Sequence, residues 1–299
     1  MSMAVNIAGV EFKNPVIAAS GTFGFGREFG EYIDLSKIGG ICSKGLTLNK
    51  NLGNKGVRIH ETSSGIMNSI GLQNPGIEYF VDIELPFLLE QDTVTIANLG
   101  GHRVEDYVEG ARILDQTEVH MIELNISCPN VKDGGMAFGT DPLKAAEVIG
   151  KVRAATTKPL IVKLSPNVGS IPEFAKLSEN MGADGISLVN TFNAMAIDIR
   201  KKAPVFANKT AGLSGPAIKP IALRMVYEAA NAVNIPVIGM GGIMNYEDAL
   251  EFIMAGADAI QIGTGNFVDY KIMEETISGI EKYMESEKIS DIKELTGII

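Results

Sequence analysis

The stretch Glu123-Leu-Asn-Ile-Ser-Cys-Pro-Asn-Val131 carries both a strong fold signal and reactive side chains. Residues 120–127 alternate and are rich in apolar and β-branched residues, which predicts a buried strand. Pro129 ends the strand because proline cannot donate to a ladder. The strand end therefore carries two amides and a thiol, on Asn125, Asn130 and Cys128. A thiol can exchange a proton and amides can hold a flat polar ligand, although a free cysteine is more often a small buried apolar residue.

Seven further segments have the same buried-strand character, at residues 15–21, 40–46, 93–98, 159–164, 185–190, 236–241 and 259–264. Amphipathic helix patterns separate most of them, at residues 104–114, 142–155, 172–181, 217–233, 246–255 and 271–285. Eight apolar strands alternating with helices predict a closed parallel sheet, the (β/α)8 or TIM barrel, as one domain over residues 1–299. An open doubly wound sheet is the alternative, but no Gly-x-Gly-x-x-Gly turn follows the first strand.

Two segments lie outside this alternation. Residues 5–12 predict a small N-terminal hairpin around Ala8-Gly9. Residues 48–75 are too long for a plain connection, and their Asn-Leu-Gly-Asn-Lys-Gly and Arg-Ile-His-Glu-Thr pieces suggest an inserted hairpin. We expect residues 68–72 to bring this insertion back over the barrel mouth.

Composition narrows the possible partners. The 299-residue chain has a net charge of −10, which argues against nucleic acid or an anionic membrane as the main partner. Its 2 cysteines and 3 histidines are scattered, so we expect neither a disulfide framework nor a metal site. No apolar run reaches membrane-spanning length and the N-terminus lacks a signal pattern, so a reducing cytoplasm is the simplest setting.

Polar residues end most of the apolar strands. In a barrel of this kind the active-site groups lie at the C-terminal strand ends. In chain order these are Ser20, Lys44, Asn98, Asn125, Lys163, Asn190 with Thr191, Gly241 with Gly242, and Gly263 with Thr264. The glycines after the last two strands predict a phosphate cradle of exposed backbone N–H groups, which Ser214-Gly215 could extend, although they could also be plain tight turns.

The two lysines need a partner if they are buried. An ammonium inside an apolar strand should meet an anionic or electron-rich group, and a reduced flavin would satisfy it. A Schiff-base lysine, as in aldolase-type barrels, is the competing interpretation, but it leaves the asparagines and the cysteine without a role.

With these residues assembled, the sequence resembles the dihydroorotate dehydrogenases, flavin enzymes of pyrimidine synthesis, over residues 4 to about 285. The matching motifs are Ala19-Ser-Gly-Thr22, Ser43-Lys-Gly45, Asn68-Ser-Ile-Gly-Leu-Gln-Asn-Pro-Gly76, the 123–131 stretch, Val162-Lys-Leu-Ser-Pro166, Val189-Asn-Thr191, Gly212-Leu-Ser-Gly-Pro216, Gly239-Met-Gly-Gly-Ile243 and Gln261-Ile-Gly-Thr264. The loop cysteine is similar to class 1 enzymes. Residues 71–76, 194–198 and 217–224 are similar to class 1B, which is NAD-linked.

The resemblance implies a role for each matching residue. FMN would be held by Ser20, Lys44, Gly45, Asn98, Asn125, Lys163, Val189, Gly215, Gly241, Gly242, Gly263 and Thr264. Dihydroorotate would be held by Lys44, Asn68, Ser69, Ile70, Gly71, Leu72, Asn125, Asn190 and Thr191, with Asn130 a further candidate. Cys128 would take the C5 proton while hydride passes from C6 to FMN N5, giving orotate.

The resemblance also implies a partner. Class 1B enzymes pass electrons to NAD through an iron–sulfur flavoprotein subunit that carries FAD and a [2Fe-2S] cluster, in a heterotetramer built on a homodimer. Several alternatives stay open: direct reduction of fumarate as in class 1A, a related FMN barrel acting on another dihydropyrimidine, a flavin-free isomerase or aldolase, and a non-catalytic binding protein.

Overall fold

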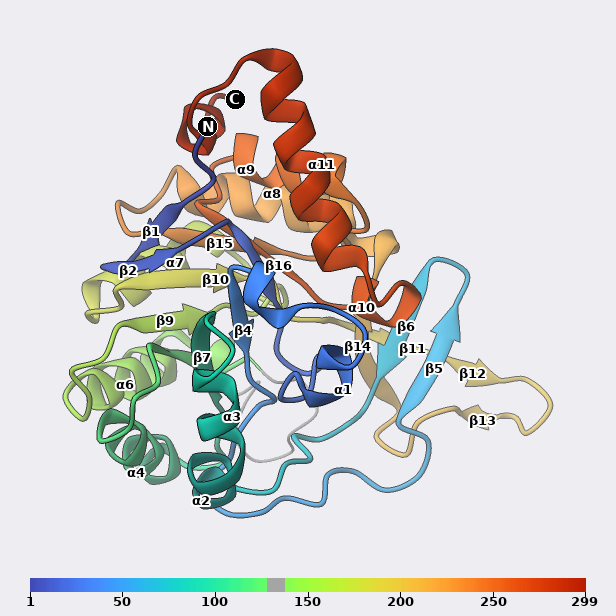
Figure 1. The fold of residues 1–299 in the computed structure, drawn as a ribbon. Helices are drawn as coiled ribbons and strands as arrows, with labels where there is room; N and C mark the ends of the chain where they lie inside the picture. Colours follow the sequence, from blue (N-terminus) through green and yellow to red (C-terminus); the bar gives the residue numbers. More distant parts are fainter. Residues whose placement is uncertain (128–137) are drawn as a thin grey trace.

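A closed barrel of eight parallel strands forms the centre of the part of the chain that the computed structural model describes, residues 1–127 and 138–299 (Figure 1). The strands follow chain order around the barrel: β3 (Val16–Ala18), β4 (Gly40–Cys42), β7 (Val94–Leu99), β8 (Met121–Asn125), β9 (Leu160–Lys163), β10 (Gly185–Leu188), β15 (Val237–Met240) and β16 (Ala259–Ile262). The predicted (β/α)8 barrel is therefore confirmed, and the open-sheet alternative is wrong.

The barrel closes where its last strand meets its first. Strand β16 pairs with β3, so that Ile260 lies opposite Val16 and Ile262 lies opposite Ala18. All of these strands except β7 are shorter than predicted. Of the predicted strand at residues 40–46, only β4 is regular. The N–H of Lys44 bonds to the Gly24 carbonyl instead of the neighbouring strand, while Leu46 donates its N–H to the Asn98 carbonyl.

Helices cover the outside of the barrel, as predicted. The longer ones are α4 (Val104–Asp115), α6 (Pro142–Arg153), α7 (Ile171–Asn180), α8 (Lys219–Ala230), α9 (Tyr246–Met254) and α11 (Ile272–Glu287). Two predicted starts are confirmed, because Asp141 accepts from the N–H groups of Leu143 and Lys144, and Asn245 accepts from that of Asp248.

Shorter helical segments were not predicted. They are α1 (Arg27–Gly30), η1 (Leu35–Lys37), α2 (Ile77–Tyr79), the π-helical η2 (Phe80–Glu84), α3 (Leu85–Leu89), η3 (Pro216–Ile218), α10 (Gly265–Val268) and η4 (Ile292–Leu295). Most are too short to show a helical period in the sequence.

Both predicted hairpins are present. Strands β1 (Val5–Ile7) and β2 (Val10–Phe12) form the N-terminal hairpin, and β5 (Ile59–Thr62) and β6 (Gly65–Asn68) form the inserted one. Residues 51–56, which were expected to take part in the inserted hairpin, contain no strand.

The inserted hairpin belongs to a larger sheet that was not predicted. Strands β11 (Phe192–Met195) and β14 (Thr210–Ser214) join it in the antiparallel order β11-β14-β6-β5, with Gly212 opposite Asn68. Figure 1 shows this sheet beside the barrel, with the β12 (Ile197–Asp198)–β13 (Ala203–Pro204) hairpin projecting beyond it. The sheet has a small apolar core of its own, made by Met67, Phe206 and Ala211.

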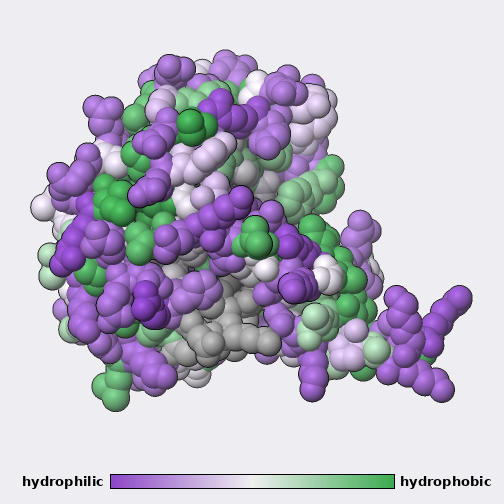
Figure 2. Space-filling view, turned by 90° about the horizontal axis from the view of Figure 1, so that it is seen from below, coloured by the Kyte–Doolittle hydropathy of each residue, from purple (hydrophilic) through white to green (hydrophobic). Residues whose placement is uncertain are grey.

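The surface seen from below is mostly hydrophilic, with scattered apolar side chains (Figure 2), which fits the charge of −10. In the described part of the chain, no helix combines the length and apolar character needed to cross a bilayer.

Candidate functional site

A cavity lies at the C-terminal ends of the barrel strands. Its floor includes Asn125 and Lys163 from β8 and β9, and one wall includes Ile59, Ile66 and Ser214 from the four-stranded sheet. The barrel thus supplies polar strand ends, and the sheet beside it supplies a side wall.

The cavity brings together most of the residues predicted from the sequence. Its lining includes Ser20, Lys44, Gly45, Asn68, Ile70, Gly71, Leu72, Asn125, Lys163, Val189, Asn190, Thr191, Gly215, Gly241, Gly242, Gly263 and Thr264. These residues come from segments spread over almost the whole chain.

Two predicted residues are not among those that line the cavity. Asn98 is fully buried and donates its side-chain amide to the Glu123 carboxylate. Ser69 is also buried, and its hydroxyl accepts from the amides of Asn54 and Asn208. Cys128 and Asn130 lie outside the described residues.

Lys163 has a buried anionic partner that sequence reasoning missed. Its ammonium lies 3.2 Å from the carboxylate of Glu123, and both side chains are almost completely buried. A signal was present in the sequence, because Glu123 is two residues before Asn125 and so points to the same face of its strand. The lysine was instead expected to meet a bound ligand.

Four more side chains donate to the Glu123 carboxylate in the described part of the chain. They come from different barrel strands: Asn98 at 2.6 Å, Ser187 at 2.8 Å, Gln261 at 2.9 Å and Cys42 at 3.2 Å. Burial alone would raise the pKa of Glu123, but Lys163 and these hydrogen bonds outweigh burial and hold the pKa below its ordinary value. The same surroundings raise the pKa of the Cys42 thiol, through burial first and the Glu123 charge second.

A chain of side-chain amides leads from this carboxylate to the cavity. The Asn125 amide donates to Asn98 at 3.2 Å, and the Asn190 amide donates to Asn125 at 3.3 Å. Asn190 also donates to the Ser127 hydroxyl at 2.8 Å. The amide side chains that face the cavity are therefore held by one another.

Lys44 is the second lysine of the cavity. Burial lowers the pKa of its ammonium below the ordinary value, and the Arg58 charge lowers it further, while Glu28 opposes both effects. A partly buried cation with a lowered pKa is suited to receive an anionic ligand.

At the glycine end of the cavity, Gly241 and Gly242 have no room for a side chain. A Cβ at Gly242 would lie 2.8 Å from the Gly215 carbonyl oxygen, and one at Gly241 would lie 2.6 Å from the Ala222 Cβ. Both glycines also have positive φ. Packing and backbone conformation therefore require glycine at both positions, and their backbone forms part of the cavity lining.

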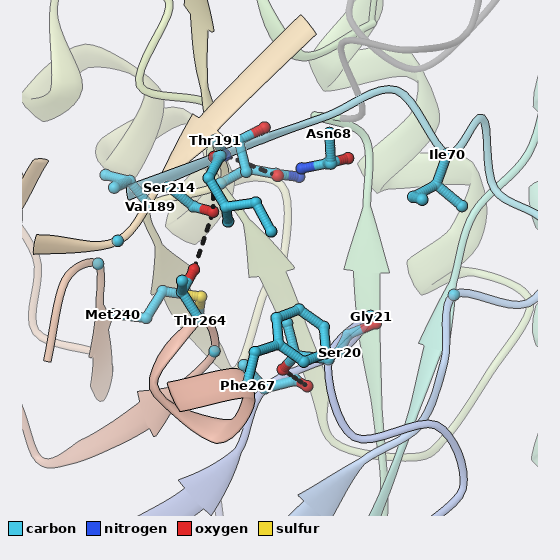
Figure 3. Close-up of a pocket in the computed structure, with 18 of the residues that line it drawn as sticks. Ser20, Gly21, Asn68, Ile70, Val189, Thr191, Ser214, Met240, Thr264 and Phe267 are labelled. Atoms are coloured by element: carbon cyan, nitrogen blue, oxygen red, sulfur yellow. Dashed lines mark hydrogen bonds between the residues drawn. The ribbon is translucent and has the colours of Figure 1, made fainter. Parts of the chain in front are cut away.

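Apolar residues complete the lining and were not predicted. They include Ile59, Ile66, Met240 and Phe267. Figure 3 shows Phe267 beside Ser20 and Gly21, across the cavity from Asn68 and Thr191. The Thr264 hydroxyl donates a hydrogen bond to the Ser214 hydroxyl at 2.8 Å, drawn there as a dashed line. Apolar surfaces with a few polar groups are typical of sites for flat organic ligands.

No group of three or more His, Cys, Asp or Glu side chains in the described residues is placed to hold a metal ion.

Comparison with known proteins agrees with this geometry. The family model described as dihydroorotate dehydrogenase matches residues 2–284. The chain belongs to the dihydroorotate dehydrogenase family. It is 62% identical to a protein of Petrotoga mobilis over 295 residues, covering 99% of this chain and 98% of the relative.

Other similar relatives come from Caldicellulosiruptor bescii, at 56% identity over 100% of this chain and 99% of the relative, and from Alkaliphilus metalliredigens, at 53% over 99% and 98%. All three relatives are named dihydroorotate dehydrogenase B (NAD(+)), catalytic subunit.

We predict that Gly242→Ala destabilises the protein by about 1–3 kcal/mol, because the new Cβ meets backbone in a left-handed conformation. Gly263→Ala is the matched control in the same cavity, since its Cβ would lie 3.7 Å from the nearest atom. Chemical denaturation measures both changes, and equal stability of the two variants would contradict the close-approach argument.

Proposed function

We propose that this chain oxidises (S)-dihydroorotate to orotate in pyrimidine (UMP) biosynthesis. The observation that carries the proposal is one cavity, in a member of this family, that combines two lysines, a chain of amides and a glycine cradle. The three relatives described above, at 53–62% identity, carry the same activity in their names.

The cofactor in this proposal is FMN. The proposed place of its phosphate is the glycine end of the cavity, where glycines place no side chain between the backbone and a ligand. The lining residues there are Gly215, Gly241, Gly242, Gly263 and Thr264. Its ring system is proposed to lie in the part of the cavity that the two lysines and the apolar side chains line. The residues proposed to contact the ring there are Ser20, Lys44, Gly45, Asn125, Lys163 and Val189. Bound FMN would supply a two-electron acceptor for a hydride. Asn98 does not line the cavity, so it would influence the flavin indirectly, by accepting a hydrogen bond from the Asn125 amide.

The substrate is a flat anion with amide groups in its ring. Amide side chains can donate to and accept from such a ring, which suits Asn68, Asn125 and Asn190 with Thr191. Lys44 offers a charge to the carboxylate. The segment 69–72 completes the proposed substrate site, in which Ile70, Gly71 and Leu72 line the cavity. Ser69 begins this segment and is held by a hydrogen bond from the Asn54 amide.

Cys128 is the proposed base that accepts the C5 proton of dihydroorotate. It follows directly after the last described residue of the strand end that carries Asn125 and Ser127. The proposal for Cys128 is supported by the family motif rather than by geometry. An ordinary thiol has a pKa near 8.5, so its surroundings must favour the thiolate at neutral pH.

The proposed route for the electrons leads through a second subunit. The relatives are named catalytic subunits of an NAD(+) enzyme, and this sequence has no nicotinamide fingerprint. We therefore propose an iron–sulfur flavoprotein partner with FAD and a [2Fe-2S] cluster, bound to a homodimer of this chain. A cytoplasmic setting is part of the same proposal, supported by the free thiol of the buried Cys42.

We expect anaerobic dihydroorotate to bleach the visible flavin band of the FMN-loaded chain. NAD should restore the band only when the partner subunit is present. Restoration by fumarate alone would favour the class 1A alternative, and an unbleached flavin would point to another dihydropyrimidine. A chain that takes up no FMN would overturn the proposed function.

The lowered pKa of Lys44 predicts a pH limit for anion binding. The ammonium is fully charged below this pKa and loses its charge as pH rises through it, so orotate affinity should fall at a lower pH than for an ordinary lysine near 10.4. Orotate titration of the flavin spectrum measures the effect, in a Cys128→Ser background that removes the thiol titration. In Lys44→Met we expect weak orotate binding that is independent of pH over this range. If orotate affinity in this variant still falls with rising pH as in the parent, Lys44 is not the group whose titration controls binding.

Loss of the proposed base should slow turnover. Cys128→Ala is expected to lower kcat by about 10²–10⁴-fold, the usual contribution of a general base, while orotate affinity is kept. Cys128→Ser should keep slow turnover, with the alkaline rise of the pH–rate profile moved to higher pH. Undiminished turnover in Cys128→Ala would remove Cys128 from the mechanism.

A further inference from the structure

Glu123 is fully buried and is not among the residues that line the cavity, yet it is bonded to Lys163, which does line it, and to Asn98, which bonds to the lining residue Asn125. It receives five side-chain donors from five barrel strands within the described residues: Cys42 from β4, Asn98 from β7, Lys163 from β9, Ser187 from β10 and Gln261 from β16. A carboxylate in this place can act on the cavity without touching a ligand.

Its first effect is electrostatic. Lys163 lines the cavity, and its ammonium lies 3.2 Å from the Glu123 carboxylate. A buried cation without a partner destabilises the fold. Glu123 therefore supplies the countercharge of Lys163 inside the barrel and reduces the positive charge that a ligand in the cavity would meet.

Its second effect is on the direction of the amide chain. An ionised carboxylate only accepts hydrogen bonds, so Asn98 must turn its NH2 group towards Glu123 and its carbonyl oxygen towards Asn125. Asn125 must then turn its NH2 group towards Asn98 and its carbonyl oxygen towards Asn190. One acceptor in the interior thus decides which way each amide at the cavity points.

We propose that Glu123 is a positioning residue of this site, which compensates the charge of Lys163 and fixes the donor and acceptor direction of Asn125 and Asn190. This inference rests on the proposed function for the identity of the ligands, but its structural basis does not. A purely structural carboxylate would hold the barrel together and leave the properties of the bound flavin unchanged.

Glu123→Gln keeps the shape of the side chain and removes its charge. The new amide has one oxygen and one NH2 group, so either can face Asn98. Within the described residues Gln261 has a buried side-chain oxygen with no hydrogen-bond partner, so its amide can turn over to accept when the new NH2 group faces it; when that NH2 group faces Asn98 instead, Asn98 turns over and the direction of the amide chain reverses. Ser187→Ala is the matched control, because it removes one neutral donor of the same carboxylate and keeps the charge and the Asn98 contact.

We expect Glu123→Gln to raise the flavin midpoint potential above those of the wild type and Ser187→Ala, because an uncompensated Lys163 favours the reduced, more negative flavin. We also expect orotate affinity to fall about tenfold, as for a lost hydrogen bond to a charged group, because the amides no longer have one enforced direction. The proposal is wrong if potential and orotate affinity in folded Glu123→Gln equal those of Ser187→Ala.

The unfolding of the flavin-free chain tests the same pair independently. Lys163→Met, Glu123→Gln and the double variant are compared, and we expect the double variant to be more stable than the sum of the two single effects predicts. If Glu123→Gln does not fold and adding Lys163→Met fails to rescue it, Glu123 is only structural and the proposal falls.

Measurements on the wild type distinguish failure of the proposed function from failure of the proposal for Glu123. If it takes up no FMN, or if dihydroorotate does not bleach it, the proposed function fails, while the unfolding comparison still decides whether Glu123 and Lys163 are coupled.

Discussion

Two opposite charges inside the barrel, on Glu123 and Lys163, constrain the structure around them. Removing charges from water costs several kcal/mol for each ion unless pairing and hydrogen bonds compensate. The neighbouring strands therefore place polar side chains where a barrel interior would otherwise be filled with branched apolar ones. Ser187 and Gln261 meet one side of the carboxylate, and Asn98 meets the other. Polar strand ends in this protein are the outer part of a network whose centre is buried.

This network also explains how far the sequence could predict the site. The predicted strands end near Asn125 and Lys163, which predicted that both side chains lie at the mouth of the barrel. In the structure these two residues lie opposite each other where β8 pairs with β9. The same period shows that Glu123 shares their face. It does not show which of several inward side chains from eight strands meet in one layer, because that depends on the stagger of the closed sheet. The partner of Lys163 was therefore not predictable from the sequence.

Contacts between distant segments account for the other omissions. Strand β14 pairs with β6 across more than a hundred residues, and its sequence around Gly212 has no strong strand pattern. Phe267 follows the last strand in a helix too short to show a period, so nothing in the sequence marked it as part of a ligand wall. Predictions from residue type found cavity residues where the signal is local, as for the glycines at 241 and 242, which follow directly after a strand and line the cavity. They failed where a role depends on tertiary contact.

The pairing of β16 with β3, which closes the barrel, brings the two ends of the chain's barrel together at the cavity. Residues 19–22 follow β3, and Gly263, Thr264, Gly265 and Phe267 follow β16. Both groups line the cavity. The site therefore does not exist in any fragment that lacks either end of the barrel. A ligand that contacts both groups would connect the two ends of the sheet. Its binding free energy opposes opening of the barrel by RT ln(1 + [L]/Kd), so occupancy and barrel closure rise and fall together.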